Sequence, residues 1–141
     1  MLVRYVVFFN ESDPDRTVRY YRSASFQPNR LAYGWMPAHP SLFMKREIYQ
    51  RLGGFKPDYR IAGDFEFIAR AFTTSKLRYE YLPEILVKMQ TGGASTASGF
   101  KGRILHNKEL LRACRENGIA TNIFKILSRY PLKLREWLVK A

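Results

Sequence analysis

The stretch IAGDFEFIAR, residues 61–70, places two carboxylates in a run of otherwise mostly apolar residues. An apolar residue recurs every three or four positions, which predicts one face of an amphipathic helix formed by Phe65, Ile68, Ala69 and Phe72. Asp64 falls at the start of this helix, directly after Gly63. An aspartate at that position accepts hydrogen bonds from unpaired N–H groups and complements the helix dipole. Asp64 could therefore be a helix cap.

The same N–H donors also favour the ionised form of the Asp64 carboxylate. A carboxylate at the mouth of a cleft that reaches a substrate hydroxyl can act as a general base. Capping and catalysis both remain open on these residues alone.

Short elements precede this helix. FQPNRLAYG, residues 26–34, predicts a short helix that Pro28 opens and Gly34 closes. The prolines on either side of His39 favour an extended segment that leads into a short strand, SLFM, residues 41–44. KREIYQRLGG, residues 45–54, predicts a second amphipathic helix that stops at its two glycines.

The two ends of the chain differ in pattern. Residues 2–9 and 17–22 are rich in β-branched and aromatic residues and flank the turn-forming NESDPD, so an antiparallel hairpin is expected. Residues 77–82 and 84–89 predict two strands separated by Pro83. Residues 100–117 and 119–140 predict helices broken near Gly118 and at Pro131.

These elements predict an α/β fold of α+β character: a small mixed sheet with flanking helices and a helical C-terminal tail. Its predicted parts are residues 1–99 and a helical segment, residues 100–141, that packs on the domain or on a membrane surface. A chain of 141 residues with 46% hydrophobic content fits one compact domain. The chain has no apolar run of 18 residues and one cysteine, Cys114, so a cytoplasmic location without disulfides is expected.

The formal net charge is +12, which attracts phosphates, acidic polymers and anionic lipid headgroups. Apolar and basic residues alternate at helical spacing through residues 122–141, which is typical of a helix at a membrane interface, although packing on the domain's own core is the favoured alternative. Binding to the inner face of a membrane therefore remains open. The chain has no Arg-rich tail, so nucleic acid is an unlikely partner.

The segment PAHPSLFMKREIYQRLGGFKPDYRIAGDFEFIAR, residues 37–70, closely resembles the acceptor side of family-two inverting glycosyltransferases of the polysaccharide type, which have the GT-A fold. The resemblance runs from about residue 3 to residue 98 and is dense between residues 36 and 94. Its motif positions are Gly53, Gly54, Phe55, Asp58, Tyr59 and Asp64. Many relatives have Glu-Asp where this chain has Gly63-Asp64.

The resemblance implies that Asp64 deprotonates a sugar hydroxyl, which then attacks a nucleotide sugar with inversion. It also implies acceptor contacts from Trp35, His39 and Arg70, although Arg70 could instead form a structural ion pair and His39 could be an ordinary loop residue. Glu66 would point away from Asp64 on a helix, so a pair of hydrolase carboxylates is not expected. A loop that covers the donor diphosphate is implied at Thr91, Gly92, Gly93, Ser95 and Thr96, with a simple connector as the alternative.

Family members carry a nucleotide-binding half whose Asp-x-Asp motif holds Mg²⁺ or Mn²⁺. Asp13-Pro14-Asp15 matches this motif literally, but we assign it to a turn between two strands and expect no metal ligands in this chain. The chain is therefore expected to be the C-terminal, acceptor-binding half, either as a fragment, as a split gene product or as a protein whose donor half lies on another chain. A partner chain or a homodimer is a possible complement, and the activity of this chain alone is in question. The alternatives are a catalytically silent module that binds glycans or lipid-linked sugars, and a basic domain for nucleic acid or a membrane surface.

Overall fold

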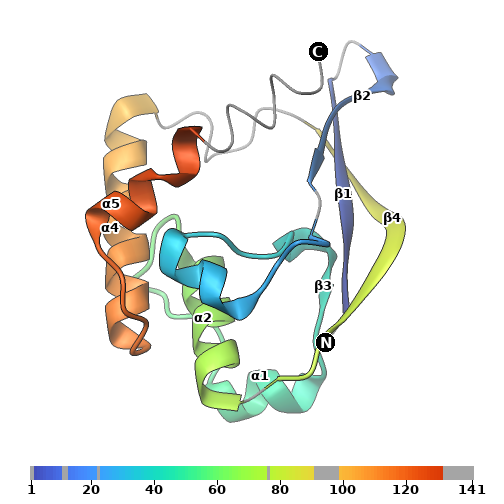
Figure 1. The fold of residues 1–141 in the computed structure, drawn as a ribbon. Helices are drawn as coiled ribbons and strands as arrows, with labels where there is room; N and C mark the ends of the chain where they lie inside the picture. Colours follow the sequence, from blue (N-terminus) through green and yellow to red (C-terminus); the bar gives the residue numbers. More distant parts are fainter. Residues whose placement is uncertain (1, 11–12, 22, 76, 91–98, 132–141) are drawn as a thin grey trace.

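The computed structural model describes the backbone of residues 2–10 and 13–21, and backbone and side chains of residues 23–75, 77–90 and 99–131. Helices dominate from residue 23 onward. They are η1 (Pro28–Tyr33), η2 (His39–Ser41), α1 (Arg46–Leu52), α2 (Gly63–Ser75), α4 (Gly99–Glu116) and α5 (Ile123–Leu127). The strands are β1 (Leu2–Asn10), β2 (Asp13–Tyr21), β3 (Leu42–Phe43) and β4 (Glu80–Gln90). Figure 1 shows the strands on one side of the molecule and α4 and α5 on the other, with α2 between them.

The four strands pair as a mixed sheet around β1. β2 pairs antiparallel with the C-terminal half of β1, β3 pairs antiparallel with its first residues, and β4 runs parallel along it. Because a strand has two edges, β2 and β3 share one edge of β1 and β4 takes the other. The expected hairpin and mixed sheet are present.

The hydrophobic core of the described residues lies among the helices. Phe65 and Ile68 of α2 are 1% and 3% exposed, as the spacing in the sequence predicted. They pack with buried residues of η1, α4, α5 and the segment before α2. The cluster consists of Phe26, Leu31, Tyr59, Ala62, Phe65, Ile68, Ala69, Leu110, Ala113, Cys114 and Ile126. Residues of α4 and α5 thus belong to the same core as α2.

Three predicted elements differ in the structure. The predicted strands 77–82 and 84–89 are one strand, β4, because Pro83 lies where the pairing with β1 shifts register and needs no donor from residue 83. Asp13, Pro14 and Asp15 belong to β2 and not to the turn. His39 begins the short 3-10 helix η2, where an extended segment was expected, and the strand after it is only two residues long.

The described helices include none that is both long enough and apolar enough to cross a membrane. Residues 132–141, which contain most of the predicted interfacial pattern, lie outside the described part of the chain.

Candidate active site

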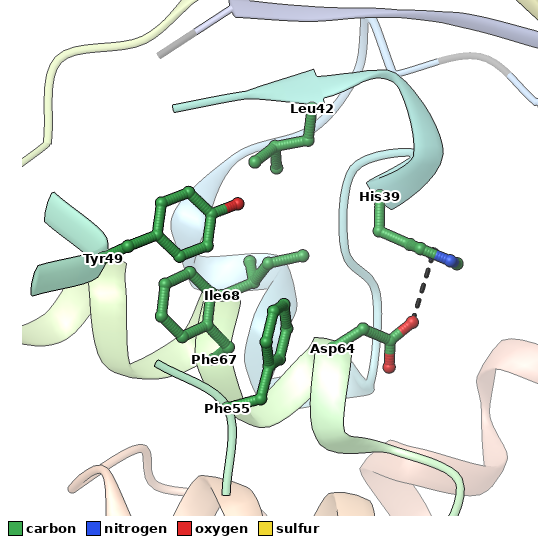
Figure 2. A pocket seen from close by; sticks show the side chains of 7 residues that line it. All are labelled: His39, Leu42, Tyr49, Phe55, Asp64, Phe67 and Ile68. Carbon is green, nitrogen blue, oxygen red and sulfur yellow. Dashed lines mark ion pairs between the residues drawn. The ribbon is translucent and has the colours of Figure 1, made fainter. Parts of the chain in front are cut away.

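The segment from α1 to α2 frames a small pocket of about 70 Å³ that opens to solvent beneath β3 (Figure 2). The start of this segment is set by a local rule. α1 ends where Gly53 adopts φ 80° and Gly54 φ 72°, a left-handed conformation that glycine adopts without strain. The pocket is lined by His39, Leu42, Tyr49, Phe55, Asp64, Phe67 and Ile68.

Among the described residues that line this pocket, Asp64 is the one with a carboxylate. It lies in the first turn of α2, as the sequence predicted. Its Oδ1 accepts a hydrogen bond from the Phe65 N–H at 2.7 Å, and its Oδ2 lies 3.1 Å from Nδ1 of His39. The Asp64 side chain is 27% exposed and that of His39 is 49% exposed, so solvent and a ligand can reach both. Asp64 thus accepts a hydrogen bond from the backbone of its own helix, and its carboxylate also lines the pocket.

Aromatic rings form the wall opposite. The rings of Tyr49 and Phe67 stack with centroids 4.7 Å apart and an interplanar angle of 9°. Phe55 lies 4.9 Å from Phe67 in a tilted arrangement. In Figure 2 the Phe55 ring is drawn between the Asp64 side chain and the Tyr49 and Phe67 rings. The pocket therefore combines one hydrogen-bonding pair with an apolar aromatic surface, the usual composition of a small-molecule site.

A buried ion pair holds the turn that carries Phe55. Glu66 is fully buried, and its Oε2 lies 2.9 Å from Nη2 of Arg70, while its Oε1 lies 3.1 Å from Nζ of Lys56. Arg70 also donates to the carbonyl oxygens of Leu52 and Gly54. A buried carboxylate requires such partners, because an unpaired one would incur a large desolvation cost.

Glu109 of α4 fixes the other end of the segment, directly before α2. Its carboxylate accepts hydrogen bonds from the N–H groups of Arg60, Ile61 and Ala62 at 2.8 to 2.9 Å. Burial raises the pKa of Glu109, but these backbone donors outweigh burial and the net pKa is lowered. Glu109 thus restrains the three residues directly before Gly63 and Asp64.

The predicted site residues divide into three groups. Asp64 and His39 lie together at the pocket. Arg70 and Trp35 do not line the pocket: Arg70 is occupied by Glu66 and two carbonyl groups, which agrees with the structural alternative, and Trp35 follows η1. The residues of the predicted diphosphate loop, Thr91, Gly92, Gly93, Ser95 and Thr96, lie outside the described residues.

The sequence did not predict the aromatic wall or the hydrogen bonds that Glu109 accepts. Phe67 carried a usable signal, because it is apolar but falls off the helical face set by Phe65 and Ile68. Tyr49 and Phe55 gave no signal of this kind. Glu109 had no local signal either, because its partners lie 47 to 49 residues away in the chain.

Comparison with known proteins finds no match to this chain among protein-family models, curated proteins or solved structures. The geometry of the pocket and the motif residues quoted above therefore carry the functional argument.

Proposed function

We propose that this chain provides the acceptor side of a GT-A-type inverting glycosyltransferase, in which a sugar passes from a nucleotide sugar to a glycan or a lipid-linked acceptor. The observation that supports this most is the Asp64 carboxylate, paired with His39 at 3.1 Å and placed at an aromatic pocket in the segment that resembles these enzymes. A general base must be within reach of the proton that it accepts, and the Asp64 side chain lines the pocket and is 27% exposed.

In this proposal the acceptor hydroxyl donates a hydrogen bond to Asp64. As its oxygen attacks the anomeric carbon, its proton moves to the Asp64 carboxylate, a C–O bond forms, and the bond to the nucleotide diphosphate breaks with its electron pair on the leaving phosphate. A single displacement inverts the configuration at the anomeric carbon. His39 orients Oδ2 of Asp64, and its half-exposed ring offers the proton a route to water.

The divalent metal implied by the resemblance does not fit the described site. Among residues 23–75, 77–90 and 99–131, no three His, Cys, Asp or Glu side chains gather as a set that could hold a metal ion. The pocket contributes one carboxylate and one imidazole, whereas Mg²⁺ prefers several oxygen ligands. We therefore derive no step through a metal and assign the donor diphosphate no contact among the described residues.

The test is sugar transfer from UDP-sugars and GDP-sugars, with and without Mn²⁺, to free and lipid-linked glycans. The product is detected by mass spectrometry, and NMR of the new linkage determines its anomeric configuration. Transfer with inversion is the expected result, and retention of configuration would contradict the single displacement. Calorimetric titration with the same donors shows whether this chain binds the donor itself or requires a second chain to do so.

A further inference from the structure

We propose that Phe55 is a stacking platform that binds the C–H face of a pyranose ring in the acceptor and so presents a ring hydroxyl to Asp64. This inference rests on the proposed function, because it names the acceptor class for the same pocket. The geometry behind it is independent of any reaction: Phe55 and Asp64 line one pocket and are presented by opposite ends of one clamped segment.

Phe55 is largely exposed to solvent even though it adjoins the core. Its side chain is 59% exposed, although the adjoining Phe67 is only 1% exposed. Tyr49 and Phe67 support it from one side, with ring centroids 6.3 Å and 4.9 Å away. One ring face is thus held against aromatic neighbours while much of the ring remains open to solvent at the pocket.

The turn before Phe55 is held in place, which makes the platform preorganised. Gly53 and Gly54 both adopt positive φ, and Arg70 binds the carbonyl oxygens on either side of Gly53. Arg70 is in turn held by the buried Glu66. A rigid aromatic ring loses little conformational entropy when a ligand stacks on it, so more of the contact energy contributes to affinity.

The chemistry of the two walls selects the ligand class. Phe55 offers an apolar face, and the pair of Asp64 and His39 offers hydrogen bonding at the pocket edge. A pyranose ring matches both, because axial C–H groups form an apolar face and hydroxyl groups project from its rim. A lipid chain would use the aromatic wall but form no hydrogen bond with Asp64 or His39, and an open-chain polyol lacks a flat C–H face.

The probes for a direct test are methyl β-D-galactopyranoside, cyclohexanol and sorbitol, titrated into the full chain and followed by NMR. We expect the pyranoside to shift the ring resonances of Phe55, Tyr49 and Phe67, and cyclohexanol and sorbitol to shift them far less. Phe55→Ala should weaken pyranoside binding by about tenfold or more, while Phe55→Tyr should retain it. Phe124→Ala is the matched control, because Phe124 is 80% exposed on α5 and does not line the pocket; it should bind as the wild type does.

The inference is overturned if no pocket resonance responds to the pyranoside, if cyclohexanol shifts the rings equally, or if Phe55→Ala binds as tightly as the wild type. Pyranoside binding that depends on Phe55, with no sugar transfer under any donor condition, would support the platform and contradict the proposed transferase. Sugar transfer at an unchanged rate in Phe55→Ala would support the proposed transferase and contradict the stacking platform. The two proposals can therefore fail separately.

Discussion

Glu109 is the residue whose removal should affect the Asp64 region most without touching the pocket. It is 6% exposed, and its carboxylate accepts hydrogen bonds from three backbone N–H groups. Glu109→Ala leaves these donors without an acceptor, so we expect the free energy of unfolding to fall by about 2–4 kcal/mol. Urea denaturation measures the change. Glu47→Ala, at an exposed position of α1, is the control, and an equal midpoint for the two variants would contradict the assigned role of Glu109.

Gly54 tests the turn that carries Phe55. A Cβ atom at this position would meet no atom within 4 Å, so the cost of Gly54→Ala comes only from φ 72° and should be about 1–2 kcal/mol. Gly63→Ala is the matched control, because Gly63 has no positive φ and a Cβ there would make an ordinary 3.5 Å contact with Tyr59. Thermal unfolding should separate the two variants. Equal stability would show that the turn relaxes freely.

At the scale of elements, ion pairs and hydrogen bonds of a charged cluster connect α4 to the segment between α1 and α2. Glu116 accepts hydrogen bonds from Lys56 at 2.7 Å, from Arg112 at 2.6 Å and from the Tyr59 hydroxyl at 3.1 Å. Arg112 also pairs with Asp58. The hydrogen bond from Lys56, the largest effect, together with Arg112 and Tyr59, lowers the pKa of Glu116 from 4.5 to about 2.

This cluster predicts a dependence of stability on pH. A carboxylate with a depressed pKa in the folded state stabilises the fold above its unfolded pKa, and this contribution is lost as the pH falls through the folded pKa. The free energy of unfolding should therefore decrease between about pH 4.5 and pH 2, with the decrease reduced in Glu116→Gln. The comparison requires urea titrations across this range. An identical pH profile in the variant would show that the cluster does not stabilise the fold.

Local signals predicted much of the helical framework, and long-range contacts explain the rest. α1 and α2 were predictable because apolar spacing and glycine stops act within a few residues. β4 was not, because whether a strand continues through Pro83 depends on its register against β1. Within the site, Asp64 and His39 could be named from the sequence, whereas Phe55 and Glu109 acquire their roles from residues brought near by folding.

On the scale of the whole molecule, the described helices share one core. Cys114 lies in this core, so the reactivity of its thiol measures how readily the core opens. The Cys114 side chain is fully buried between α4 and η1, and burial raises the pKa of its thiol to about 11. The native protein should therefore react with a thiol reagent such as DTNB only as fast as the core opens. Adding urea should accelerate the reaction in step with unfolding. Rapid labelling of the native protein would mean that α4 separates from the core without global unfolding.

The central claim is that Asp64 is the general base of a sugar transfer, and the most direct measurement is the transfer rate of Asp64→Asn. Asparagine nearly keeps the shape of the side chain but cannot accept the proton, so the rate should fall by about a hundredfold or more while the fold is retained. Glu47→Gln, which removes an exposed carboxylate on α1, should leave the rate unchanged. Transfer by Asp64→Asn at the wild-type rate would contradict the account.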